Sequence, residues 1–233
     1  MKRSLLAAVV LAAFAPLAQA APPSPSAILA DSVDVLDDLA ALQIKGIPPA
    51  LLADAQGVAI IPRVIKAGFV FAGRGGYGVV MTKDKTGNWA APVFIAIGGA
   101  SVGFQAGVES TDVVLVFRGR KSLDRILEGK DKLTLGGDAA IAAGPVGRQA
   151  AVATDGKLEA EIVSYSRSRG LFAGVSLDGA VISNDRIAND DFRKHATEKD
   201  LKRAGDLATR LNKMGAPLPT SAAELLPPVP VRK

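Results

Sequence analysis

GVAIIPRVIKAGFVFAGRGGYGVVMT occupies residues 57–82 of the chain. It contains three short runs rich in aliphatic and β-branched residues, at 58–61, 64–72 and 77–82, with glycines and charged residues between them. Short apolar runs bounded by glycine are typical of β-strands, and the glycines between them are typical of tight turns. The stretch therefore predicts consecutive strands in a mainly antiparallel sheet.

The same pattern continues toward the C-terminus. Two segments, 85–88 and 154–157, have the glycine and polar composition of hairpin turns. Helical spacing returns only briefly, at 122–127. We interpret the remaining apolar runs as strands, at 89–97, 113–117, 133–152, 158–165 and 170–182.

Amphipathic helices are predicted on both sides of this β-rich region. One runs from Ser26, a candidate N-cap, to about Leu42, and a short second helix starts near Ile47. From Asn189 the chain is again helical, and its apolar stripe ends at Met214. This order of elements predicts an α+β fold with a single domain, whose sheet either closes into a barrel-like shape or stays open.

The first 20 residues have the composition of a secretory signal peptide. A basic pair at 2–3 precedes an apolar run at 5–15, which is shorter than the ~20 residues that a membrane span needs. Because residues 18–20 form a small-x-small cleavage site, we expect cleavage after Ala20 and export to a bacterial periplasm. The expected domain boundaries are 1–20 for the signal peptide, 21–26 for a flexible lead-in, 27–214 for the folded domain and 215–233 for a Pro-rich mobile tail.

Composition argues against several functions. The chain has no cysteine and one histidine, so neither disulfides nor thiol catalysis nor cysteine-ligated metals are expected, and no cofactor is predicted. Aromatic residues make up 5% of the chain and no basic run is present, so nucleic-acid binding is not expected. Loss of Lys2 and Arg3 with the signal peptide takes the formal charge from +5 to +3, which permits attraction to anionic surfaces.

Two short motifs suggest enzymes only weakly. Residues 73–78 match GxGxxG, but β-forming residues follow where a nucleotide site needs a helix, so we interpret the motif as a turn between strands. Ser101 lies in a GxSxG motif, and Asp112 or Asp185 with His195 would complete the chain order of a serine hydrolase. The residues after Ser101 return to strand rather than entering a helix, so this hydrolase is the least favoured of three hypotheses.

The segment 164–185, SYSRSRGLFAGVSLDGAVISND, combines Arg167 and Arg169 with an apolar Gly-Leu-Phe-Ala-Gly step. It predicts an apolar hairpin with a cationic collar, which suits binding rather than chemistry. From about Ile28 to Asn189 the chain resembles the SYLF domain family. The segments that carry the resemblance are 64–69, 74–78, 89–92, 103–109 with Asp112, 133–138, 143–148 and 164–179.

The resemblance implies a non-enzymatic module whose eukaryotic members bind phosphoinositides and sometimes actin, often beside an SH3 or FYVE domain. It implies that cationic residues inside the family motifs contact lipid headgroups. The expected contacts are Lys66, Arg74, Arg167 and Arg169, with Leu171 and Phe172 as membrane or partner contacts.

One departure from the family lies in the N-terminal helix, which is basic in lipid-binding relatives. Here it carries four aspartates and no Lys or Arg, so we expect it to cover the core rather than to meet anionic lipid. A periplasm offers neither actin nor, ordinarily, phosphoinositides. The expected partner is therefore another anionic phospholipid at a membrane surface, and the alternative is an envelope protein docked on the hairpin at 170–174.

Overall fold

The computed structural model describes residues 21–41, 47–68, 71–102, 107–129, 132–144, 160–168, 171–174 and 177–216. The helices are α2 (Pro25–Ala40), α3 (Pro49–Asp54), α4 (Arg120–Glu128), α6 (Arg186–His195) and α7 (Glu198–Gly215). The strands are β1 (Gly57–Gly68), β2 (Phe71–Thr82), β3 (Val93–Val102), β4 (Gly107–Phe117), β5 (Leu133–Thr134), β6 (Ile141–Ala143), β7 (Ile162–Ser168), β8 (Leu171–Gly174) and β9 (Val181–Asn184).

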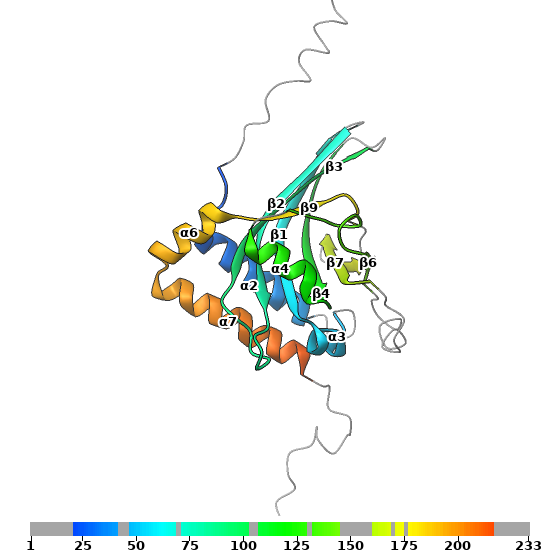
Figure 1. Ribbon diagram of the computed structural model, residues 1–233. Coiled ribbons are helices and arrows are strands. Elements are labelled where there is room, and N and C mark those ends of the chain that lie inside the picture. Colours follow the sequence, from blue (N-terminus) through cyan, green and yellow to red (C-terminus); the bar gives the residue numbers. More distant parts are fainter. Residues whose placement is uncertain are drawn as a thin grey trace, which may run out of the picture.

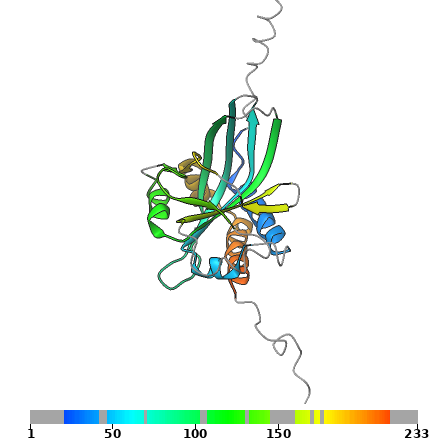
Figure 2. The same ribbon diagram turned by 90° about the vertical axis from the view of Figure 1, so that its right-hand side faces the viewer.

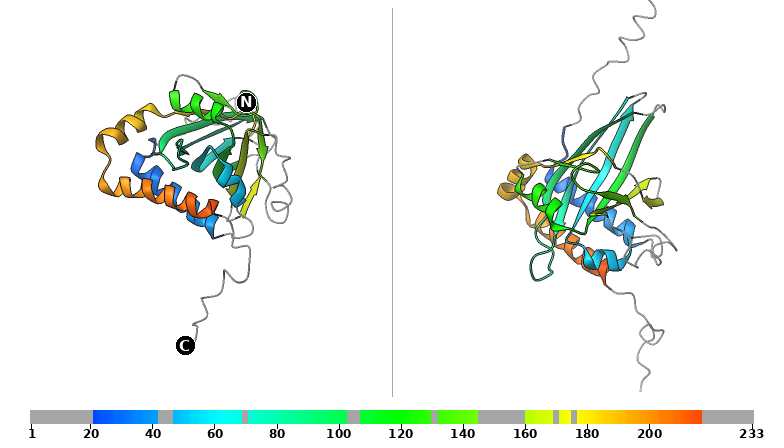
Figure 3. Two further views of the ribbon diagram at one scale, coloured as in Figure 1. Left: turned by 60° about the horizontal axis from the view of Figure 1, so that its bottom comes forward. Right: turned by 45° about the vertical axis from the view of Figure 1, so that its right-hand side comes forward.

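All nine strands belong to one sheet in the order β5-β9-β3-β2-β1-β4-β7-β6, with β8 paired to β7. The two strands at the ends of this order, β5 and β6, are consecutive in the chain and are joined by residues 135–140. A short connection can join them only if the sheet curls until its ends approach each other, and Figure 3 shows this curled sheet. The predicted α+β fold with a mainly antiparallel, barrel-like sheet is therefore confirmed; the β6–β7 pair alone among the described strand pairs is parallel.

Both faces of the curled sheet are buried. In β1 the side chains alternate: Val58 and Ile60 face one core, Ala59 and Ile61 the other, and all four are 0% exposed. This alternation follows from the two-residue period of a strand. The outer face packs against α2, α3, α6 and α7, while the inner face packs against α4 and the segment that contains β5 (Figure 1).

Helix α2 lies against the outer face as the sequence predicted. Its apolar positions, among them Ile28, Leu29 and Leu36, are fully or almost fully buried. Its N-cap is Ser24 rather than the expected Ser26, because Pro25 fits the first turn of a helix, which therefore starts two residues earlier. Among the described residues no helix is both long and apolar enough to span a bilayer.

The C-terminal helical segment is divided in two, which the apolar stripe did not predict. Asp185 caps the start of α6, and Thr197 with Asp200 forms a capping box at the start of α7. The expected strand at 133–152 is likewise divided: β5 and β6 are short and separated by a turn in which Gly136 adopts a φ of 81°. The turn predicted at 154–157 lies outside the described residues.

The GxGxxG motif is not a turn between strands, as we expected, but part of β2 itself. Strand β1 carries a bulge between Ile60 and Ile65, and the bulged backbone crosses close over β2. A Cβ atom at Gly78 would lie 2.2 Å from the carbonyl oxygen of Ile60, so only glycine fits there. The glycines therefore serve a close approach of two backbones, which is one of the roles that glycine has in strands.

We expect Gly78→Ala to lower the free energy of unfolding by about 2–3 kcal/mol, because the new methyl group must displace the backbone of β1. Gly73→Ala is the matched control in the same strand, since a Cβ atom there meets nothing within 4 Å. Urea unfolding of both variants checks this. Equal stability of the two variants would contradict the close approach at Gly78.

Helices α2 and α7 are joined by Asp37 and Arg210, with Nε–Oδ1 and Nη2–Oδ2 distances of 2.6 and 2.9 Å. The hydrogen bond from Arg210 holds the pKa of Asp37 below its ordinary value of 3.8. A carboxyl group with a lowered pKa stabilises the folded state above its unfolded pKa, and this stabilisation is lost as the pH falls through the folded pKa.

We therefore expect Asp37→Asn to cost about 0.5–1 kcal/mol at neutral pH, the range of a well-formed pair near the surface. The difference from wild type should shrink as the pH falls below 3.8 and through the lowered pKa of Asp37. Asp34→Asn on the same helix is the control, since Asp34 acts on Arg210 only through charge at longer range and forms no hydrogen bond with it. A difference that does not change with pH would show that the pair contributes nothing through charge.

Candidate functional site

Strands β1 to β4 extend beyond the helices as a four-stranded projection, which Figure 2 shows most clearly. We call this projection the β-arm and define it as residues 65–68, 71–75, 98–102 and 107–110. Its two connections, 69–70 and 103–106, lie outside the described residues. The β-arm holds two of the residues that the sequence analysis singled out, Lys66 and Arg74.

Lys66 and Arg74 are direct cross-strand partners in β1 and β2. Direct partners in an antiparallel pair share a face, and their Cβ atoms lie ~5 Å apart. That face is the inner one, since Val64, two residues before Lys66, belongs to the inner core. The stem of Arg74 lies over Gly99 of β3, where a Cβ atom would be 3.4 Å from the Arg74 Cγ. The tertiary structure thus brings the two cations side by side.

The charges of this pair are not balanced within the described part of the chain. Neither Lys66 nor Arg74 forms an ion pair or a hydrogen bond with another described residue. Glu109 of β4 is the opposite partner of Lys66 in the register, and its carboxylate accepts a hydrogen bond of 3.4 Å from Thr111. Gly99, Arg74, Lys66 and Glu109 thus form one row of register partners across the four strands of the β-arm. This row carries two positive charges at its centre and one carboxylate at one side.

Arg167, the third candidate, lies elsewhere and is engaged. It stands opposite Asp112 of β4, on the outer face of the sheet beneath α2, and its side chain is 26% exposed. Its guanidinium forms an ion pair with Asp38 of α2 and a longer one, at 3.8 Å, with Asp112. In this position Arg167 ties α2 to the sheet.

Two further aspartates on the acidic face of α2 also form ion pairs with arginines of the protein. Asp31 forms an ion pair with Arg63, whose backbone N–H donates to Asp112 at 3.0 Å, and Asp37 forms the pair with Arg210. Three of the four aspartates of α2 thus face arginines of the protein itself. Sequence reasoning missed these partners, since the arginines lie on distant strands and on α7.

The remaining candidates belong to the β7–β8 hairpin. The predicted hairpin is confirmed, because Ser168 pairs with Leu171 in an antiparallel register. Strand β7 runs toward the β-arm, since Asp112 pairs with Arg167 and Phe117 with Ile162. Arg169 and the side chains of Leu171 and Phe172 lie outside the described residues.

The geometry of a serine hydrolase is not formed. Ser101 lies in β3 opposite Ala72, and the chain continues into β4 rather than into a helix. His195 lies on α6, and this helix is attached to β3 at Phe94, whose backbone N–H donates to Asn189 Oδ1 at 2.8 Å. Phe94 and Ser101 are seven residues apart in β3, which corresponds to roughly 23 Å along the strand. His195 itself bonds to Asp191 at 2.8 Å on its own helix.

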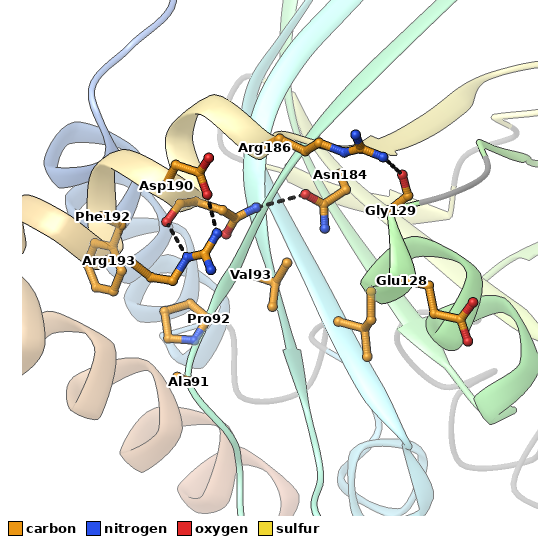
Figure 4. Close-up of a pocket in the computed structure, with 12 residues that line it drawn as sticks. Ala91, Pro92, Val93, Glu128, Gly129, Asn184, Arg186, Asp190, Phe192 and Arg193 are labelled. Atoms are coloured by element: carbon orange, nitrogen blue, oxygen red, sulfur yellow. Dashed lines mark hydrogen bonds and ion pairs between the residues drawn. The ribbon is translucent and has the colours of Figure 1, made fainter.

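A cavity of about 540 Å³ lies between α4 and α6, and Figure 4 shows the residues that line it. Its polar groups bond to one another: Arg186 donates to the Gly129 carbonyl, and Asn189 donates to Asn184 at 3.1 Å. Arg193 forms an ion pair with Asp190. The bond from Arg186 joins α6 to the end of α4, and the bond from Asn189 joins α6 to β9, so we interpret the cavity as a structural joint. No group of metal-ligating side chains occurs among the described residues.

The elements described so far define a class of protein in which a curled sheet, covered by helices, presents a cationic pair on a projecting arm. Residues 98–215 match the family Ysc84, described as Las17-binding protein actin regulator, and the chain belongs to this family. This confirms the resemblance to SYLF domains.

Three curated relatives illustrate the likeness. Protein YSC84 of Saccharomyces cerevisiae is 45% identical over 149 residues, which cover 63% of this chain and 31% of the relative. An SH3 domain-containing protein of Schizosaccharomyces pombe is 40% identical over 177 residues, 75% of this chain and 40% of the relative. SH3 domain-containing YSC84-like protein 1 of Xenopus laevis is 39% identical over 148 residues, which cover 64% of this chain and 44% of the relative. The chain spans less than half the length of these relatives.

Replacement of Arg167 by Met tests its role at the helix–sheet contact. We expect a loss of about 1–2 kcal/mol in unfolding free energy, because Asp38 and Asp112 would lose the cation between them. Arg193→Met is the control, since its ion pair with Asp190 is exposed and should contribute little. Thermal unfolding measures both. A variant as stable as wild type would leave Arg167 free for another role.

Proposed function

We propose that this protein is exported to the periplasm and acts there as a non-enzymatic, peripheral membrane protein. In this proposal Lys66 and Arg74 bind the phosphates of anionic phospholipids. The single observation that carries it is the pair of adjacent cations, neither of which forms an ion pair with a described carboxylate, on an arm that projects beyond the helices. The signal-peptide composition of residues 1–20 supports the location.

The acidic helix α2 does not oppose this proposal as strongly as its sequence suggests. Its aspartates at 31, 37 and 38 are paired with Arg63, Arg210 and Arg167. Their charges are largely compensated inside the protein, so repulsion from an anionic surface is reduced. The β-arm can therefore meet the membrane while α2 keeps its role as a cover of the outer core.

The chemistry of the two side chains suits phosphate. Arginine presents a planar fork of donors that matches a phosphate group, and lysine acts as a compact point charge. A basic residue near an anionic surface contributes ~1 kcal/mol, so the pair would contribute ~2 kcal/mol, roughly a thirtyfold change in affinity. Salt should weaken the interaction, because dissolved ions screen exposed charges and the Debye length is only ~10 Å at 0.1 M ionic strength.

Vesicle co-sedimentation of the chain from Ala21 tests the proposal. We expect binding to vesicles that contain phosphatidylglycerol, weaker binding at high salt, and no binding to neutral vesicles. Lys66→Glu/Arg74→Glu should lose at least tenfold in affinity, since both charges are reversed. Glu109→Gln should bind more tightly, because it removes the carboxylate beside Lys66.

Lys121→Glu/Lys194→Glu is the charge-matched control on α4 and α6, where both lysines are exposed. The proposal holds if this control binds within twofold of wild type. Equal losses in the two double variants would reduce the effect to net charge and refute a site on the β-arm. Arg169→Glu measures the contribution of the β7–β8 hairpin separately.

A second candidate function is protein interaction at the envelope. Strand β8 pairs with β7 on one side and, among the described strands, has no partner on the other, so it offers an edge for an added strand. Relatives carry names such as LAS seventeen-binding protein 3. Capture of a defined envelope protein that is lost in Phe172→Asp, together with absence of vesicle binding, would favour this function.

A further inference from the structure

The end of the β-arm is uncharged beyond the row that holds Lys66 and Arg74. The described residues past this row share small or apolar side chains, apart from one serine. They are Ala67, Gly68, Phe71, Ala72, Gly73, Ala100, Ser101, Val102, Gly107 and Val108. The cations thus form a border between the charged body of the protein and an uncharged end.

The outer face of the β-arm is open at its glycines and at two apolar residues. A Cβ atom added at Gly73 or at Gly98 would meet nothing within 4 Å, so nothing described covers these positions. Of the four large hydrophobic residues that are exposed among the described ones, Ile65 and Val108 lie on the β-arm, and Val108 is 77% exposed. Ile65 and Val108 are diagonal neighbours on one face of strands β1 and β4, and adjoining exposed apolar residues commonly mark an interaction site.

We propose that the end of the β-arm inserts into the headgroup–acyl boundary of an anionic bilayer, with Lys66 and Arg74 at the level of the phosphates. This inference rests on the proposed function and adds a mode of binding to it. The membrane is held by apolar burial at the end of the β-arm as well as by charge.

The length of the uncharged end fits this depth. Beyond the cationic row each strand continues for two to three described residues, and at ~3.3 Å per residue this amounts to roughly 7–10 Å. Apolar faces of interfacial elements are buried ~5–10 Å into the boundary between headgroups and acyl chains. The cations would then lie at the phosphates when the end is fully immersed.

Backbone hydrogen bonding limits the depth. Strands β1 and β2 are paired on both sides along the β-arm. The outer strands are not: β9 pairs with β3 only as far as Gly98, and β7 pairs with β4 only from Asp112 onward. Their outward N–H and C=O groups need water or headgroups, because unsatisfied backbone groups in hydrocarbon cost several kcal/mol each. Insertion therefore stops at the boundary and does not reach the hydrocarbon core.

A lipid surface fits the end better than a second copy of the chain. The exposed apolar residues Ile65 and Val108 lie on the outer face, whereas the cations lie on the inner face of the same strands. A protein partner docked on one face would meet only one of these groups, whereas a bilayer boundary surrounds the end and meets both, with anionic phosphates beside the cations.

Tryptophan fluorescence with brominated phosphatidylglycerol measures insertion directly. The chain has one tryptophan, Trp89, which forms an isolated β-bridge with Lys83. It precedes the first residue of β3, at the end of this strand that lies away from the β-arm. The variant Trp89→Phe/Val108→Trp moves the probe to the end of the β-arm, at a position exposed enough to accept it. We expect bromine on the upper acyl chain to quench the new tryptophan by at least half, and Trp89 of the parent chain by less than a tenth.

Val108→Asp provides the second measurement. It should lose at least tenfold in affinity for anionic vesicles, while Ile187→Asp should not, although Ile187 on α6 is 83% exposed. Vesicle binding with neither quenching nor loss in Val108→Asp would overturn the insertion and leave headgroup binding standing. Absence of vesicle binding by the parent chain would refute both proposals. Self-association that Val108→Asp abolishes, with vesicle affinity unchanged, would assign the end to a second copy and overturn the insertion.

Discussion

The segment Val58–Ile61 is buried on both sides, and much of the structure follows from this constraint. A strand that is apolar on both faces needs a packing layer on each side. Burial of apolar surface stabilises the folded state by ~25 cal/mol per Å² removed from water. The outer cover comes from helices at both ends of the chain, α2 and α7. The inner cover arises because the sheet curls over itself and adds α4. The curl brings together β5 and β6, which end the strand order although they are consecutive in the chain.

Charge is distributed around this core in two ways. Arginines beneath or beside α2 meet its aspartates, so the acidic face of the helix contributes to its attachment rather than to a ligand site. Lys66 and Arg74 lie on the inner face of the sheet, opposite to the face that α2 covers, and neither forms an ion pair with a described residue. The same strands that form the centre of the core thus also present the candidate site, and the bulge over Gly78 lies between the two parts.

Much of the fold could be predicted from patterns of apolar residues and glycines. The β-forming character of 57–82, the turn at 85–88, the β7–β8 hairpin and the N-terminal helix all follow from local spacing. The three runs predicted at 58–61, 64–72 and 77–82 nevertheless form two strands, because β1 ends at Gly68 and β2 begins at Phe71, both inside the run 64–72. The predictions that were wrong depended on contacts between distant segments. The motif at 73–78 looks like a turn, and it is a strand because its glycines admit the backbone of β1. The segment at 133–152 looks like one strand, and it is divided because its two parts pair with opposite ends of the sheet.

The sequence by itself determined the α+β class, the mainly antiparallel sheet, the cover provided by α2 and the family to which the chain belongs, since these depend on local periodicity and on motifs. Only the tertiary structure decided which cations stand together. Four basic residues carried equal weight as candidates, and strand register placed Lys66 beside Arg74 while Asp38 and Asp112 engaged Arg167. Register and ion pairing are properties of segments far apart in the chain, so residue type and spacing along the sequence do not contain them.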